Sequence, residues 1–90
     1  MDFQTEGNSI IYKNADGVVL ARTDFSEAAL GVYDIFHTEV DASLQGQGVA
    51  GKLVARAVAE IERRGGRVME DPSCSYAAAW LKRHAEKGAS

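Results

Sequence analysis

The sequence predicts an α+β domain: an antiparallel β-meander, then a βαβ unit and a C-terminal helix. The first half consists of short runs rich in β-branched and aromatic residues, separated by turn residues. After residue 48, apolar residues recur at helical spacing, at Val49, Leu53, Val54, Ala57, Val58 and Ile61. A short apolar run and a second helical stretch follow. A chain of 90 residues suits one domain, which we place over residues 1–90.

The N-terminal half is expected to hold extended segments joined by short turns. Gly17 can adopt positive φ in the first turn, and Gly31 or Asp34 is expected to mark a bulge or break. The predicted segments are a strand at 8–13, a turn at 14–17, a strand at 18–25, a connection at 26–28 and a long strand at 29–40.

In the second half, Arg63 and Arg64 suit the C-terminal end of the first helix, and Gly65-Gly66 should stop it. Residues 67–70 then form a short strand, parallel to the one that ends at Val40 because a crossover helix joins them. A second helix is expected from about residue 75 to 87. We assign its inward stripe to Tyr76, Trp80, Leu81, His84 and Ala85, with Gly88 as its cap.

Composition narrows the function without naming it. Hydrophobic residues make up 46% of the chain and charged residues 26%, as in ordinary globular proteins. No apolar run approaches a membrane span and the N-terminus does not resemble a signal peptide, so we expect a cytoplasmic protein that does not bind membranes. The net charge of −3 argues against nonspecific nucleic-acid binding. We expect a monomer or a weak dimer.

The glycine-rich stretch after Val40 is the strongest functional signal. Gly46, Gly48 and Gly51 let a ligand approach the backbone, and the first amides of the following helix lack intrahelical acceptors. Such a turn favours a phosphate or pyrophosphate. Since the net charge disfavours a polyanion at long range, Lys52 and Arg56 are candidate cations for it.

Three phosphate motifs compete for these residues. Residues 46–51 fit the dinucleotide pattern G-x-G-x-x-G, with Glu70 and Asp71 about 20 residues on, but too little chain follows for the βαβ repeats of that fold. Residues 46–52 have the spacing of a Walker A loop, but Leu53 stands where the Mg²⁺-binding Ser or Thr must be.

The third motif, Gln45-x-x-Gly48-x-Ala50, resembles the coenzyme A loop of the GNAT superfamily of N-acetyltransferases. The flanking segments 37–40 and 72–76 resemble small stand-alone members, and the likeness covers about residues 35–84. It implies that acetyl-CoA is the cofactor, with its pantetheine arm along the strand that ends at Val40 and its acyl end in a slot between splayed strands. It also implies that the pyrophosphate is held by Gln45, Gly46, Gln47, Gly48, Val49 and Ala50.

Two residues are candidates for catalysis. Cys74 lies just before the second helix, where free amides stabilise a thiolate, and the resemblance places it at the mouth of the slot. As the only cysteine, it forms no internal disulfide and has no CxxC partner for zinc, and we expect no metal site. Glu39 is a candidate base. Strict alternation puts it on one face with Ile35 and His37, and puts Phe36, Thr38 and Val40 on the other.

Other polar and aromatic residues are interpreted structurally. We expect His37 to hydrogen-bond within the sheet, Trp80 to lie in the core and His84 to lie at the surface or at a helix end. Tyr76 has two interpretations: it matches in type the tyrosine that many GNAT enzymes use as the thiolate acid, or it packs.

The resemblance therefore implies an acetyl-CoA-dependent N-acetyltransferase whose acceptor is an amine on a protein or a small molecule. The helices that build the acceptor site in full-length GNAT enzymes have no room between Asn14 and Phe36. One alternative is a module or sensor that binds acyl-CoA without turnover. Another is a nucleotide-binding protein that uses the Walker-like spacing.

Overall fold

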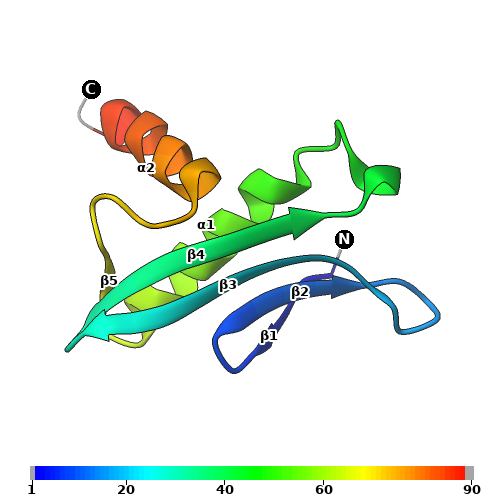
Figure 1. The fold of residues 1–90 in the computed structure, drawn as a ribbon, viewed down its shortest axis with the longest axis horizontal. Coiled ribbons are helices and arrows are strands. Elements are labelled where there is room, and N and C mark those ends of the chain that lie inside the picture. The colour runs from blue at the N-terminus through cyan, green and yellow to red at the C-terminus, as the bar shows by residue number, and fades with distance from the viewer. Residues whose placement is uncertain (1, 89–90) are drawn as a thin grey trace.

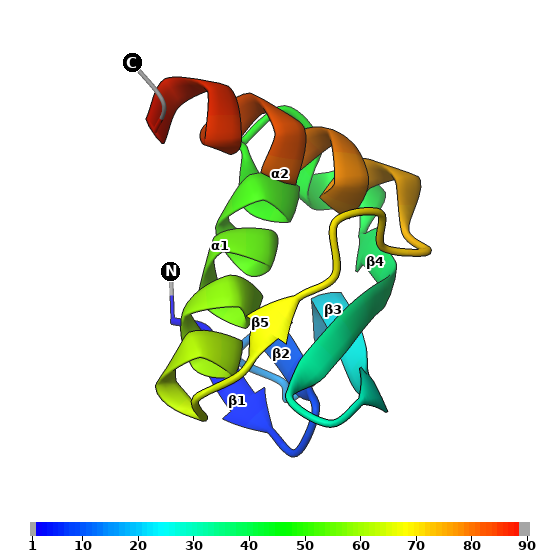
Figure 2. The same cartoon turned by 90° about the vertical axis from the view of Figure 1, so that its left-hand side faces the viewer.

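The computed structural model describes residues 2–88, and it confirms the expected α+β class. A five-stranded sheet with the order β1-β2-β3-β4-β5 is packed against α1 (Val49–Arg63) on one face, while α2 (Ser75–Gly88) crosses near the N-terminal end of α1 (Figures 1 and 2). The antiparallel strands are β1 (Gln4–Glu6), β2 (Ser9–Lys13), β3 (Val19–Ala29) and β4 (Val32–Val40). β5 (Arg67–Val68) pairs with β4 in parallel, as predicted for a crossover connection.

The β2–β3 turn forms where the sequence predicts it. The Asn14 Oδ1 atom accepts the N–H groups of Asp16 (2.9 Å) and Val18 (3.0 Å), and Gly17 adopts φ of 80°. This Asx-type turn explains why asparagine and glycine occupy these positions.

The predicted connection at 26–28 is wrong, because β3 continues to Ala29. The reversal lies at Leu30 and Gly31, where Gly31 adopts φ of 74° and its N–H donates to Glu27 Oε2 at 2.7 Å. Gly31 is thus a turn residue, and Asp34 is a regular strand residue paired with Ser26. The short strand β1 was not predicted, because its side chains are all exposed and have no alternating pattern.

The core lies between α1 and the sheet. Helix α1 buries Val49, Leu53, Val54, Ala57 and Ile61, the stripe that the periodicity predicts apart from Val58, which is partly buried. These side chains pack on sheet residues that share one face, namely Ile10, Ala21, Phe25, Tyr33 and Ile35. Burial of this apolar surface is the main favourable term that holds α1 on the sheet.

The C-terminal end of α1 is anchored by charge. Glu60 accepts hydrogen bonds from Arg63 (2.6 Å) and Arg64 (2.8 Å), and these contacts lower the pKa of Glu60 to about 2. Arg64 also donates to Asn8 Oδ1 and to the Gly7 carbonyl, both at 2.6 Å. The guanidinium of Arg64 therefore ties the helix to the β1–β2 turn. The helix ends as predicted, with Gly65 at φ of 83°.

Three expectations for the C-terminal part need correction. The predicted strand at 67–70 pairs with β4 only through Arg67 and Val68. In α2, Ala77 is fully buried and Trp80 packs against the core, whereas Tyr76 and His84 are exposed. The exposed His84 ring stacks on Trp80 at 3.6 Å, and Nδ1 contacts the Trp80 carbonyl at 2.8 Å. The side chain of Ala85 lies outside the described residues, and Gly88 is the last residue of the helix rather than a cap beyond it.

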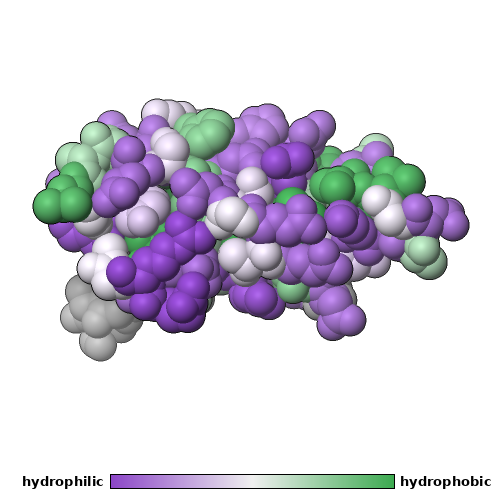
Figure 3. Space-filling model, turned by 90° about the horizontal axis from the view of Figure 1, so that it is seen from below, coloured by the Kyte–Doolittle hydropathy of each residue, from purple (hydrophilic) through white to green (hydrophobic). Residues whose placement is uncertain are grey.

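Seen from the side of β1 and β2, the surface is mainly hydrophilic, with hydrophobic patches near the two ends of the long axis (Figure 3). In residues 2–88, neither helix has the length and apolar character needed to cross a membrane.

Candidate functional site

The site begins where β4 leads into the glycine loop. A single 3-10 turn, η1 (Ala42–Leu44), follows β4 and is capped by Asp41. Asp41 Oδ2 accepts the hydroxyl (2.6 Å) and the N–H (2.9 Å) of Ser43, and these hydrogen bonds lower the pKa of Asp41. The side-chain Nε2 group of Gln45 then donates a hydrogen bond to the Val40 carbonyl at 3.2 Å. The loop is thus fixed to the end of the strand before α1 starts.

Two glycines shape the loop by their backbone angles. Gly46 and Gly48 adopt φ of 82° and 72°. These angles lie in the left-handed region, which is unfavourable for residues that carry a Cβ atom. Added Cβ atoms at these positions would meet nothing within 4 Å, so the chain needs glycine there for its conformation and not for space.

The loop encloses a small hollow of about 90 Å³. It is lined by Val40, Leu44, Gln45, Gly46, Gly48, Val49 and Ala50. Of the predicted loop residues, only Gln47 lies outside this lining.

The start of α1 presents free donors beside that hollow. The N–H of Lys52 makes the first bond of α1, to the Gly48 carbonyl at 3.2 Å, so the amides of Val49, Ala50 and Gly51 have no intrahelical acceptor. Gly48 has no side chain with which to cap them. Unsatisfied N–H groups at the positive end of a helix favour an anion.

β4 has an unpaired edge that runs towards this loop. β5 pairs only with Val32 and Tyr33, and the N–H of Cys74 makes a further bond to the Ile35 carbonyl at 3.0 Å. The N–H of Asp41 bonds to Leu20 on β3, so the alternating Thr38 and Val40 direct their backbone groups to the opposite side. Among the described residues, no strand pairs with β4 on that side beyond Ile35.

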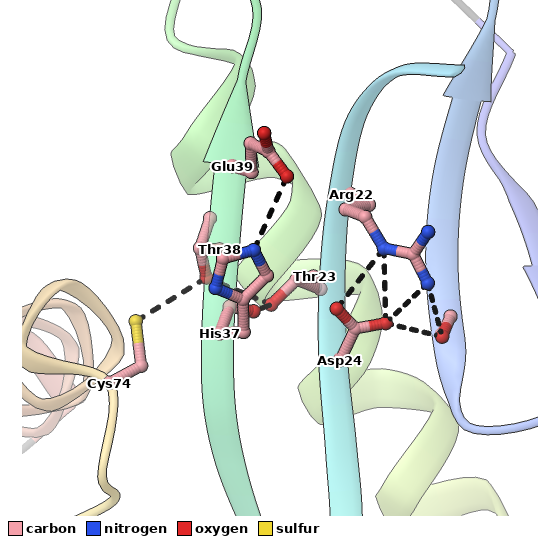
Figure 4. A network of polar contacts seen from close by, with 8 residues as sticks. Arg22, Thr23, Asp24, His37, Thr38, Glu39 and Cys74 are labelled. Atoms are coloured by element: carbon pink, nitrogen blue, oxygen red, sulfur yellow. Dashed lines mark hydrogen bonds and ion pairs between the residues drawn. The ribbon is translucent and has the colours of Figure 1, made fainter. Parts of the chain in front are cut away.

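Cys74 lies beside this edge. Its carbonyl accepts the N–H of Ala78 at 3.0 Å, which makes Cys74 the residue that precedes α2. Its half-buried Sγ atom lies 3.5 Å from Thr38 Oγ1, and Thr38 Oγ1 lies 2.9 Å from Thr23 Oγ1 (Figure 4). The sequence interpretation missed both threonines, because nothing in their spacing distinguishes them from ordinary strand residues.

The predicted alternation along β4 is wrong for Ile35. Asp24 pairs with His37 while Phe25 pairs with Ile35, so Phe36 is an extra residue that bulges from the ladder. Ile35 is therefore buried in the core and Phe36 is 47% exposed. After the bulge, Thr38 and Val40 face the core side, whereas His37 and Glu39 face away from it.

Glu39 thus lies on the opposite face of the sheet from Thr38. Its carboxylate is 3.3 Å from His37 Nε2 and its side chain is 68% exposed (Figure 4). The same face carries Arg22, whose guanidinium is 2.8 Å from Asp24. A hollow of about 200 Å³ adjoins this group, lined by residues 19–22 with Glu39 and Asp41.

Arg22 and Asp24 form an ion pair on the sheet face that carries Glu39, and each keeps the other charged. Burial alone would raise the pKa of Asp24, but hydrogen bonds from Arg22 and Ser9 outweigh it and hold this pKa below its usual value. The pKa of Arg22 is raised by the same contact. Arg22 is therefore paired mainly with Asp24, and the charge of Glu39 makes a smaller contribution to its raised pKa.

The remaining predicted residues are not brought into the site. Lys52 and Arg56 are exposed on α1 and line none of the hollows described above. A larger hollow, of about 670 Å³, lies between residues 68–71 and α2, and none of the residues predicted for the acetyl-CoA site lines it. The Tyr76 hydroxyl lies close to Gly51, where α2 meets α1, in agreement with a packing role.

Three features of the site occur together: the unpaired edge of β4, the glycine loop that follows this strand, and the uncapped amides at the start of α1. Together they define an acyltransferase-type α+β domain. The chain belongs to the GCN5-related N-acetyl-transferase family, whose sequence model matches residues 9–89. It is accordingly an N-acetyltransferase domain.

Solved structures support this fold. A GCN5-like protein from Staphylococcus aureus is 23% identical, with a TM-score of 0.74 over 97% of this chain and 83% of its own. The GNAT family N-acetyltransferase YhbS from Escherichia coli, solved in complex with CoA, is 20% identical with a TM-score of 0.61. The match covers 78% of this chain but only 43% of the E. coli chain. No curated protein matches the chain significantly.

Proposed function

We propose that this chain, over residues 1–90, transfers an acetyl group from acetyl-CoA to an amine acceptor. The observation that carries the proposal is the open edge of β4, which runs from the Cys74 contact at Ile35 to the hollow at the glycine loop. Residues 36–40 of that edge span about 13 Å at the usual rise of a strand. An extended ligand could therefore reach from the anion site to the thiol.

The residues of this edge and loop fit the cofactor. The amides from Gln45 to Ala50 would hold the pyrophosphate, and Gln47, whose side chain lies 3.5 Å from the Ser43 carbonyl, would contribute through its backbone. The backbone groups of Thr38 and Val40 would pair with the pantetheine arm. Bound acetyl-CoA supplies the acetyl group as a thioester.

The two candidate catalytic residues would then act from opposite sides of β4. Glu39, beside the hollow of about 200 Å³, would accept the proton of the acceptor ammonium. Cys74 would lie on the other side, near the sulfur end of the arm. An acceptor on a protein or a small molecule suits this face, because the hollow is open and no helix covers it among the described residues.

The test uses two glycine variants with the same backbone cost. Gly48→Glu puts a side chain and a negative charge at the anion site. Gly17→Glu makes the same change at φ of 80° in the remote β2–β3 turn, where a Cβ also meets nothing within 4 Å. Each should cost about 1–2 kcal/mol of stability because glycine favours this conformation. Calorimetry should show acetyl-CoA binding to the wild type and to Gly17→Glu, and none to Gly48→Glu.

ATP and NAD in the same titrations test the nucleotide-binding alternatives, and neither should bind. Equal acetyl-CoA affinity in both glycine variants would remove the loop from the proposal. Radiolabelled acetyl-CoA and a panel of amines then test transfer, which should give a labelled product. Binding without any labelled amine or cysteine would instead establish a module that holds acyl-CoA without turnover.

A further inference from the structure

Asp34 joins β4 to the segment that leads into α2. Its Oδ1 atom accepts the N–H of Ser73 at 2.7 Å, and its Oδ2 atom accepts the Ser73 hydroxyl at 2.6 Å. Residues 34 and 73 are far apart in sequence, so this contact is tertiary. Both donors belong to one residue, and a carboxylate that accepts two such bonds forms a strong, directional link.

This link stands at the point where β5 leaves the sheet. The Met69 N–H still bonds to the Tyr33 carbonyl at 2.9 Å, but the next backbone bond to β4 is made by Cys74. Residues 70–73 make no backbone bond to β4 in the described chain. The Asp34 carboxylate therefore substitutes for the missing strand pairing and brings Cys74 back to Ile35.

A chain of hydroxyl groups then orients the thiol. The single O–H of Thr23 donates to the His37 carbonyl at 2.9 Å, so the Thr38 hydroxyl must donate to Thr23 in their 2.9 Å contact. Thr38 Oγ1 is left as an acceptor for the Cys74 S–H at 3.5 Å. Because Thr23 is fully buried, its bond to the His37 carbonyl fixes the donor and acceptor roles of Thr38 and Cys74.

We propose that Asp34 is a positioning residue: through Ser73 it holds the Cys74 thiol against Thr38 at the inner end of the open β4 edge. This inference rests on the proposed function, in which that edge carries the acyl donor. Figure 4 shows the Cys74 sulfur directed at Thr38, on the side of β4 away from His37 and Glu39. Asp34 touches neither the thiol nor the open edge, so its effect on the reaction is indirect.

Alkylation of Cys74 by iodoacetamide tests the link without any cofactor, since this is the only cysteine. Asp34→Ala removes both bonds, while Asp34→Asn removes the same charge but keeps one acceptor and one donor facing Ser73. Ser73→Ala removes only the hydroxyl bond. The matched control is Glu27→Ala, which deletes a carboxylate that accepts the Gly31 N–H at 2.7 Å at the far end of the β3–β4 hairpin.

We expect alkylation in Asp34→Ala to be about tenfold faster than in the wild type, a size set by the loss of hydrogen bonds to a charged group. Asp34→Asn should restore a rate close to wild type, Ser73→Ala should lie between, and Glu27→Ala should not differ. In turnover, Asp34→Ala should lower kcat by about the same factor and leave the KM for acetyl-CoA nearly unchanged, because the loop that holds the diphosphate is intact.

Identical alkylation rates in Asp34→Ala and Glu27→Ala would overturn the inference, as would a KM effect equal to the kcat effect. If Asp34→Ala does not fold, as judged by circular dichroism, the Ser73→Ala rate decides in its place. A wild-type protein that neither binds nor uses acetyl-CoA would contradict the proposed function alone, because the alkylation comparison still decides whether Asp34 holds the thiol.

Discussion

The threonine pair at the centre of the sheet gives a measurable test of the hydroxyl chain. Thr23 is 0% exposed, and its hydroxyl both donates to the His37 carbonyl and accepts from Thr38. We consider Thr23→Val, Thr38→Val and the double variant. Valine keeps the shape and the β-branching of threonine, so each change removes a hydroxyl with little repacking.

The structure sets the size of each effect. Thr23→Val removes two hydrogen bonds of a fully buried hydroxyl, to the His37 carbonyl and from Thr38, and should cost about 1–2 kcal/mol of unfolding free energy. Thr38→Val should cost about 1 kcal/mol, since Thr38 is only half-buried. In the double variant both hydroxyl groups are absent, so neither is left without its partner. Its loss of unfolding free energy should therefore be about 0.5–1 kcal/mol smaller than the sum of the two single losses.

Urea unfolding measures these differences, and for a chain of this size about 1 kcal/mol corresponds to a shift of roughly 1 M in the midpoint. Thr5→Val, on the exposed strand β1, is the control for the strand preference of valine and should change stability by less than about 0.5 kcal/mol. If the two core substitutions are additive within about 0.3 kcal/mol, the hydroxyl groups are not coupled and the proposed direction of the chain is wrong.

Two further outcomes test other parts of the fold. Because the pKa of Glu60 is lowered from 4.5 to about 2 in the folded chain, the stability it contributes is present above pH 4.5 and is lost as the pH falls towards 2. Urea unfolding should therefore give the wild type a higher free energy of unfolding than Glu60→Gln at pH 6, and the two values should converge at low pH. A difference that does not change with pH would contradict the ion-pair explanation. Gly66→Ala should lower the free energy of unfolding by about 1–3 kcal/mol, because the half-buried Gly66 has no room for a Cβ atom and its neighbours must shift. The new Cβ would lie 2.8 Å from Tyr33 Cε1 and 3.0 Å from the Gly31 carbonyl, and an unchanged urea midpoint would show that these groups move aside freely.

The parts of the fold that the sequence predicts well are those with local causes. The apolar stripe of α1 (apart from Val58), the turn at residues 14–17 and the glycine stop at Gly65 each depend on residues close in sequence, and all are confirmed. The parallel pairing of β5 with β4 is also confirmed, because a crossover helix leaves few other arrangements.

The errors have non-local causes. The reversal at Leu30 and Gly31 was predicted too early because Ser26, Glu27 and Ala28 are poor strand formers by composition. They nevertheless form part of β3, since β4 pairs opposite them. Tertiary pairing therefore overrides a weak local preference here.

The candidate site divides in the same way. The glycine loop is visible in the sequence because its function needs particular backbone angles, which only certain residues adopt. The Asp34–Ser73 link is not visible, because an aspartate inside a strand looks like any exposed polar residue until residue 73 is placed beside it. A sequence pattern could have found it only through co-variation of the two positions.

The bulge at Phe36 explains why one strand can serve both the core and the site. Before the bulge, the odd-numbered Tyr33 and Ile35 face α1; after it, the even-numbered Thr38 and Val40 do so. Without the extra residue, strict alternation would bury His37 and Glu39 or expose Ile35, and either change is costly, because buried charges and exposed core side chains both destabilise a sheet. The bulge therefore allows Glu39 to face solvent while Thr38 reaches Cys74 from the opposite side of the same strand.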